Sequence, residues 1–324
     1  MRRITAVNRS GRLSVSTRLL RRLALASLIA NVVIVVTGGA VRLTGSGLGC
    51  PTWPRCTEDS YVATAEMGIH GAIEFGNRMI TWVVGAIAIA GLIAALRYRP
   101  RRRSLVLLSG AVLFGVALQA IVGGITVRTG LHPSVVGIHF ILSMALLLCT
   151  YAFWRRVDEA DGPVQALVPG PLRTLTWITV AVSAAVLFVG VAVTGSGPHS
   201  GDPQAPRNGL DPEMISQVHA DVVFLLIGLS IALWYALRAV DAPPAAIRAA
   251  GILVVVELSQ SLIGFVEYFT GLPAVLVGAH MLGSCLVWLA TLAVLWATRK
   301  RQSPTGSSVH AAAPPAELID TFRP

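Results

Sequence analysis

Eight apolar stretches, each long enough to cross a lipid bilayer, dominate this sequence. They occupy residues 23–41, 69–96, 105–127, 135–154, 174–195, 214–237, 249–268 and 275–298. A transmembrane helix needs about 20 apolar residues. Hydrophobic residues make up 54% of the chain and charged residues only 13%, which excludes an ordinary water-soluble domain. The sequence therefore predicts an all-α integral membrane protein with eight transmembrane helices, whose surroundings are the lipid bilayer.

The basic residues are distributed unevenly between the two ends of the predicted helices. Of the 26 lysines and arginines, 21 lie in five segments on one side: 1–22, 97–103, 155–173, 238–248 and 299–324. Basic residues accumulate on the cytoplasmic side of a membrane. We therefore expect a multi-pass protein of the cell (plasma) membrane with both termini in the cytoplasm. The outward loops are then 42–68, 128–134, 196–213 and 269–274. This topology explains the net charge of +10, which therefore does not indicate a nucleic-acid partner.

An internal repeat with an offset of 141 residues relates the third and fourth predicted helices to the seventh and eighth. The matched positions are Gln119 and Gln260, Gly123 and Gly264, Thr129-Gly130-Leu131 and Thr270-Gly271-Leu272, Gly137 and Gly278, His139 and His280, and Ser143 and Ser284. The sequence TGSG also occurs at the ends of the first and fifth helices, at 44–47 and 194–197. The repeat predicts two tandem four-helix bundles related by internal duplication.

The repeat also sets the expected boundaries of the chain's parts. They are a basic cytoplasmic tail at 1–22, an N-terminal half at 23–154, a cytoplasmic linker at 155–173, a C-terminal half at 174–298 and a disordered cytoplasmic tail at 299–324.

Two histidines in the C-terminal half are predicted to lie at the same depth. His219 and His280 each lie 18 residues before the cytoplasmic end of their helix. Since a helix rises about 1.5 Å per residue, both should lie at one level near the outer leaflet. Ionisable groups inside a membrane are costly and usually functional. Two inward-facing imidazoles at one level favour axial ligation of a haem iron, whereas a single histidine in a helix is more often a packing residue.

The N-terminal half is less symmetrical. His139 is the repeat mate of His280, but Asn77 lies at the depth that His219 has in the other half. His70 is two turns above Asn77, about 10 Å nearer the outside. Glu74 lies between them on the same helical face. Its carboxylate is a candidate general base or charge-stabilising group, or else one half of an ion pair with Arg78 or Arg42.

The four cysteines are of two kinds. Cys50 and Cys56 lie in the first outward loop, where an oxidising compartment permits a disulfide, although two free thiols remain the alternative. Cys149 and Cys285 are single thiols within helices and are expected to be packing residues.

These motifs together resemble the haem A synthase family. The resemblance rests on TGGAVRLTGSGLGCPTWPRC at 37–56, IEFGNR at 73–78 and the repeated histidines, and extends over residues 20–300. It implies an oxidoreductase acting on a CH group, which converts a porphyrin methyl group of haem O to a formyl group. The product would be the haem A of terminal oxidases. A haem O synthase and terminal oxidase assembly are the implied partners.

The resemblance also implies roles for individual residues. His219 and His280 match the axial ligands of a haem b, and His139 matches a ligand of the substrate haem. Glu74 matches the catalytic carboxylate, and Cys50 and Cys56 match an outward cysteine pair.

The chain departs from the family pattern at two places. Many relatives have a histidine at the position of Asn77, so His139 is expected to ligate the substrate haem alone or together with His70. A second cysteine pair, known in some relatives, is absent from 196–213. Two other classes fit part of the pattern. They are a di-haem b-type membrane electron-transfer protein and a transporter with a duplicated bundle.

Overall fold

A computed structural model describes residues 5–7 and 13–303, so the predicted tail beyond residue 303 and most of the N-terminal tail lie outside the described residues. The eight long helices are α1 (Thr17–Leu43), α2 (Gly68–Arg97), α3 (Arg103–Arg128), α4 (Pro133–Asp158), α5 (Gly170–Ser196), α6 (Pro212–Ala239), α7 (Pro244–Phe269) and α8 (Ala274–Ala297). The short elements are the strands β1 (Thr5–Val7), β2 (Leu13–Val15), β3 (Val164–Ala166) and β4 (Arg299–Arg301) and the 3₁₀ helix η1 (Ala65–Met67).

All eight helices are long and apolar enough to cross a membrane, which confirms the predicted all-α membrane class. Four of them, α1, α4, α5 and α7, extend four to six residues beyond the predicted spans at the arginine-rich end. The apolar pattern ends at the first arginines, whereas the backbone hydrogen bonds of the helix continue through them. Lys and Arg side chains tolerate this position because their charged groups reach the interface.

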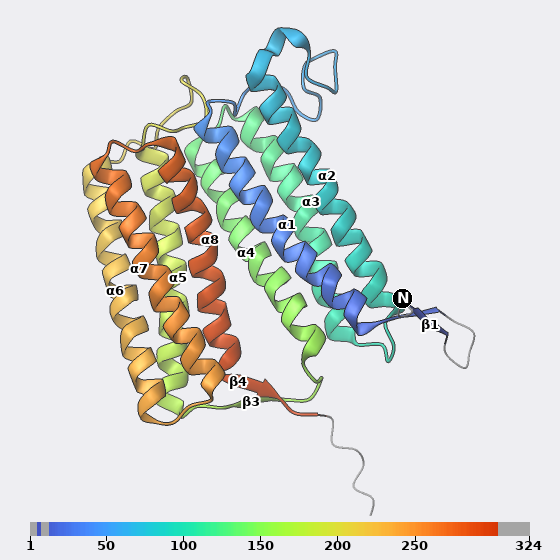
Figure 1. Cartoon of the computed structure of the whole chain (residues 1–324). Coiled ribbons are helices and arrows are strands. Elements are labelled where there is room, and N and C mark those ends of the chain that lie inside the picture. Colours follow the sequence, from blue (N-terminus) through green and yellow to red (C-terminus); the bar gives the residue numbers. More distant parts are fainter. Residues whose placement is uncertain (1–4, 8–12, 304–324) are drawn as a thin grey trace, which may run out of the picture.

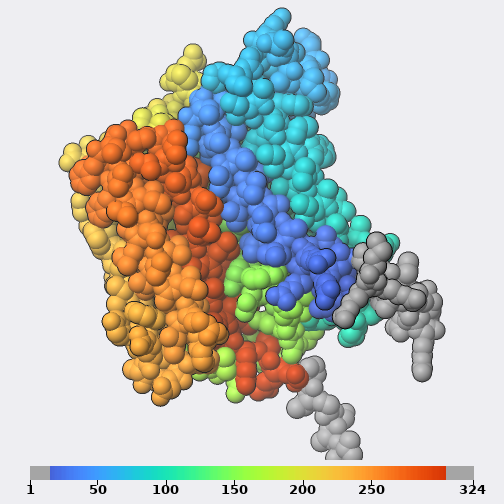
Figure 2. Space-filling model, in the orientation of Figure 1, coloured from blue at the N-terminus to red at the C-terminus, as the bar shows by residue number. Residues whose placement is uncertain are grey.

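The helices pack as two groups of four, α1–α4 and α5–α8 (Figure 1). Within each group, consecutive helices are antiparallel neighbours and the first contacts the fourth. The groups meet where α1 and α4 contact α8 and where α4 contacts α5. The indole of Trp288 donates a 3.0 Å hydrogen bond to the Met144 carbonyl across this junction. The segment between α1 and α2 extends beyond the other loops at the same end of the helices (Figure 2).

The same local geometry occurs at matched positions of the two halves. Leu131 and Leu272 both adopt positive φ angles, of 60° and 61°, directly after Gly130 and Gly271. A positive φ is uncommon for a residue with a branched side chain, so its occurrence at both leucines is a specific similarity. Each leucine N–H also bonds back to the last helical turn, at 2.9 Å and 2.8 Å. By contrast, α1 ends before its TGSG segment, whereas α5 continues to Ser196.

The linker between the halves is fixed by charged side chains and by a short sheet. Arg156, which is 5% exposed, donates hydrogen bonds to Asp161 and Glu159. Arg102 also bonds to Asp161, and this hydrogen bond holds the pKa of the Asp161 carboxyl below its usual value. β3 in the linker pairs antiparallel with β4. The predicted disorder of 299–324 is therefore wrong for 299–301, because backbone pairing with the linker orders these residues.

Candidate functional site

The structure brings the His219 and His280 rings together inside the second helix group. Their centroids are 6.5 Å apart and their planes are inclined by 63°. The two histidines come from α6 and α8, which are not consecutive, so their proximity depends on the level at which each lies. Counting residues from the cytoplasmic helix ends predicted this common level. Their role as ligands remains a prediction.

A glycine lies against each of the three histidines that are predicted to bind iron. A Cβ atom at Gly190 would lie 3.2 Å from the His219 ring, and one at Gly264 would lie 3.0 Å from the His280 ring. At Gly123 the same atom would lie 3.4 Å from the His139 ring. These glycines are on α5, α7 and α3. They leave room for an imidazole between two packed helices, where a larger residue would displace the ring.

The three rings also share an unpaired ring nitrogen. Among the described residues, the Nδ1 atoms of His139, His219 and His280 are buried and have no hydrogen-bond partner. Buried polar atoms are normally paired, and in a metal-bound histidine the ring nitrogen opposite the metal needs an acceptor of its own. Two histidines are too few to hold a bare zinc ion, but a haem iron takes only one or two axial ligands from the protein. The residues therefore fit a haem between α6 and α8.

The backbone of α4 and α8 beside these histidines is held in the same way in both halves. Gln119 on α3 donates a 3.2 Å hydrogen bond to the carbonyl of His139, and Gln260 on α7 donates a 2.7 Å bond to the carbonyl of His280. Each glutamine thus fixes the helix segment that carries its histidine.

On α2, Asn77 and His70 are both occupied by other partners. The amide oxygen of Asn77 accepts a 2.8 Å hydrogen bond from Thr37. His70 is exposed, and its Nδ1 lies 2.9 Å from the hydroxyl of Ser46. It borders a cavity of about 660 Å³ at the end of the helices that carries the loop between α1 and α2. The lining also includes Thr44, Gly45, Leu48, Gly49, Pro51, Met67, Asp202 and Pro203. The structure thus places His70 at the outer end of α2, two turns above Asn77.

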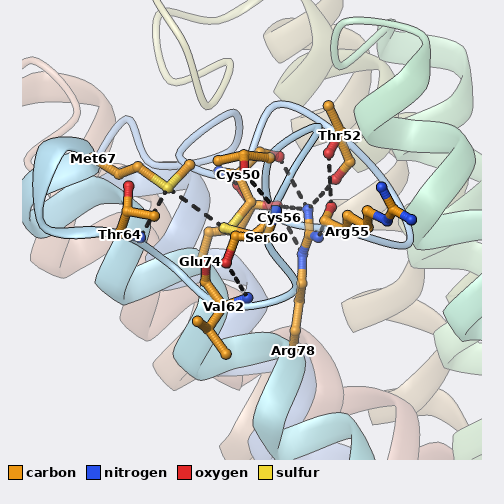
Figure 3. Close-up of a disulfide and its surroundings, with 11 residues drawn as sticks. Cys50, Thr52, Arg55, Cys56, Ser60, Val62, Thr64, Met67, Glu74 and Arg78 are labelled. Atoms are coloured by element: carbon orange, nitrogen blue, oxygen red, sulfur yellow. Dashed lines mark hydrogen bonds and ion pairs between the residues drawn. A yellow bond between two sulfur atoms is a disulfide. The ribbon is translucent and has the colours of Figure 1, made fainter.

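Glu74 is 5% exposed and faces the first outward loop (Figure 3). Its carboxylate accepts a 2.5 Å hydrogen bond from the backbone N–H of Cys50. Arg78 lies one turn further along α2 and donates to the other carboxylate oxygen at 2.5 Å. Of the two alternatives for an ion pair, the structure shows the one with Arg78. Arg42 instead donates a 2.6 Å bond to the carbonyl of Thr194.

Arg78 connects the same carboxylate to the backbone of the loop. Its guanidinium donates 3.0 Å hydrogen bonds to the carbonyl oxygens of Cys50, Thr52 and Arg55. Sequence reasoning missed this role, because contacts to backbone 23–28 residues away leave no periodic pattern. Glu74 and Arg78 together hold the loop against the outer end of α2.

Cys50 and Cys56 form a disulfide that closes this loop. Both are fully buried, so an intact protein would protect even free thiols from a reagent. We expect that alkylation after denaturation without a reductant modifies Cys149 and Cys285 only. Alkylation after reduction should modify all four cysteines. Peptide mass analysis distinguishes the two patterns, and Cys149 and Cys285 serve as internal controls. Modification of Cys50 and Cys56 in the unreduced sample would contradict the disulfide.

Comparison with known proteins gives one family and several relatives. Residues 21–199 match the family model COX15-CtaA, described as cytochrome oxidase assembly protein. The heme A synthase of Geobacillus kaustophilus (strain HTA426) is 25% identical over 320 residues, which cover 93% of this chain and 99% of the relative. The heme A synthase of Symbiobacterium thermophilum is 28% identical over 189 residues, 55% of this chain and 60% of the relative. A protoheme IX farnesyltransferase of Thermus thermophilus is 26% identical over 281 residues, 81% of this chain and 45% of the relative.

Proposed function

The chain belongs to the COX15-CtaA family of cytochrome oxidase assembly proteins, and from this premise we propose that it is a haem A synthase. It oxidises a porphyrin methyl group of haem O to a formyl group. The observation that carries the proposal is the pair of His219 and His280 rings, whose centroids are 6.5 Å apart, in a chain similar along almost its whole length to a heme A synthase.

The two haem sites lie in different halves of the chain. His219 and His280 hold a haem b, which when bound supplies a one-electron relay. His139 ligates the substrate haem in the first half, where Gly123 leaves room for its ring. Oxidation of a methyl group to an aldehyde adds one oxygen atom, from water or an oxygen species, and removes electrons and protons, so the site needs a proton acceptor as well as the relay. Glu74 is the buried carboxylate of this half and takes that role.

Arg78 and the Cys50 N–H determine where the Glu74 carboxylate lies. Their hydrogen bonds fix both of its oxygens, so the group has one orientation relative to α2. General bases act efficiently only when they are held within reach of the proton they remove. In this proposal the disulfide loop therefore supports the position of the carboxylate.

The cellular location and the partners of the enzyme follow from the same proposal. It is a plasma-membrane protein with both termini in the cytoplasm, because 21 basic residues lie on that side. A haem O synthase supplies the substrate, and the product goes to terminal oxidase assembly. The similarity to a protoheme IX farnesyltransferase and the description of the family support these partners.

The test is haem analysis of cells that lack their own synthase but have a source of haem O. Expression of the chain should produce haem A, identified by chromatography and mass of the extracted pigment. Haem O that stays unchanged beside a purified low-spin haem protein would instead favour an electron-transfer protein. A purified protein without a Soret band, despite adequate haem supply, would contradict both.

The variant Glu74→Gln is the most informative one in the same assay. We expect haem A formation to fall by about 100-fold or more, since general acid–base groups contribute at least that much. The glutamine oxygen can still accept the Cys50 N–H, so the loop and the haem b spectrum should persist. Glu66→Gln, at an exposed position in η1, is the matched control. Undiminished haem A formation in Glu74→Gln would rule out the proton-acceptor role.

A further inference from the structure

Glu267 on α7 lies beside His280. Its carboxylate Oε2 is 3.7 Å from the Nδ1 atom of the imidazole, and its side chain is 14% exposed. Among the described residues, neither of these two atoms has a hydrogen-bond partner. A distance of 3.7 Å is longer than a hydrogen bond. The two groups are nevertheless close enough that a small side-chain rotation would join them.

Comparison of the two halves shows that this carboxylate is peculiar to the second. One face of α7 carries four residues at spacings of three and four: Glu257, Gln260, Gly264 and Glu267. The matched positions on α3 hold Val116, Gln119, Gly123 and Thr126. The glutamine and the glycine, which position and accommodate the histidine, occur in both halves. Thr126 instead donates a 2.9 Å hydrogen bond to the Val122 carbonyl of its own helix.

A carboxylate at the edge of a membrane span is costly unless it has a partner. When one ring nitrogen of a histidine binds a metal, the other carries the proton and becomes a donor. Such histidines almost always donate this N–H to a carboxylate, a carbonyl or a water, which fixes the ring and increases its basicity as a ligand. Glu267 offers the acceptor at Nδ1 of His280. His219 has no such carboxylate among the described residues.

We propose that Glu267 is a positioning residue for the haem b of this protein, which accepts the Nδ1–H of His280 and orients that ring toward the iron. The inference rests on the proposed ligation of haem b by His280. It makes the two axial ligands unequal, because the His280 imidazole then donates more electron density to the iron than the His219 imidazole. A more basic ligand favours the oxidised iron, so Glu267 lowers the reduction potential of the haem. It also slows loss of the haem.

The test compares purified haem-loaded parent protein with Glu267→Leu and Glu267→Gln. Potentiometric titration of the haem b absorption should give a higher midpoint potential for Glu267→Leu. Transfer of haem to excess apomyoglobin should be about 10-fold faster, at the lower end of the usual effect of losing such a partner. Glu267→Gln keeps an acceptor oxygen but no charge, so its values should lie between those of the parent and Glu267→Leu. This conservative variant also serves if Glu267→Leu does not fold.

Glu257→Gln is the matched control, because it removes a different carboxylate, which is buried, from the same helix. Glu257 accepts a 2.8 Å bond from Ser230 and lies ten residues away along α7. Its variant should keep the parent's potential and haem retention. Parent-like values in both Glu267 variants, or equal shifts in Glu257→Gln, would overturn the inference. Absence of low-spin haem from the parent itself would instead overturn the proposed function, so the two failures are distinguishable.

Discussion

Replacing His219 or His280 with alanine is expected to abolish the low-spin haem b spectrum of the purified protein. The rings lie 6.5 Å apart on α6 and α8, and each variant removes one of two axial ligands. A haem iron with a single histidine is expected to become high-spin, with a changed Soret band and a weaker hold on the protein. Optical and electron paramagnetic resonance spectra measure the change.

His132→Ala is the matched control for these two variants. His132 is an exposed histidine at the N-cap position of α4, and its side chain makes no capping hydrogen bond there. Its variant should keep the parent spectrum. A low-spin spectrum that is unchanged in His219→Ala or in His280→Ala would refute the pairing of these two ligands, because each histidine should be indispensable to it.

The sequence predicts the helices and the histidine pair for the same physical reason. A bilayer imposes a minimum length on every span, so apolar runs mark the helices and residue counts along them give depth. The closeness of His219 and His280 follows from depth and from the repeat. The similar turns at Leu131 and Leu272 also follow from matched residues.

The features that the sequence does not predict depend on contacts between distant segments. The pairing of 299–301 with 164–166 gives no recognisable strand pattern, because each strand has only three residues. The bonds from Arg78 go to carbonyl oxygens, which are present at every residue and so give no signal. α1 ends before its TGSG segment and α5 ends within the identical segment, so these four residues alone do not determine where the helix ends.

The ligand of the substrate haem is the point at which the two halves differ most. Asn77, which has the depth of His219, is bound to Thr37, and a Cβ atom at Gly38 would lie 3.9 Å from its amide nitrogen. Gly190 lies against His219 in the other half in a similar way. Asn77 lies at the expected depth of a second ligand but has no imidazole. We therefore expect His139 to be the main axial ligand of the substrate haem.

We expect His139→Ala to lose the substrate haem and His70→Ala to retain it together with partial haem A formation. The reason is that the His139 ring lies within the first helix group against Gly123, whereas His70 is exposed and its ring contacts the Ser46 hydroxyl. Haem content of each purified variant, measured after supply of haem O, checks the prediction. The haem b signal from His219 and His280 serves as the internal standard for correct folding.

A single strong ligand suits a site that must admit haem O and release haem A, whereas two histidines suit a cofactor that stays bound. Tighter binding usually means slower dissociation. A second histidine ligand, whether His70 or a histidine at position 77, would therefore delay product release. If His70→Ala loses the substrate haem as completely as His139→Ala, depth along α2 does not decide the ligand. In that case the outer end of α2 must move inward by about two turns, roughly 10 Å, to bring His70 to the iron.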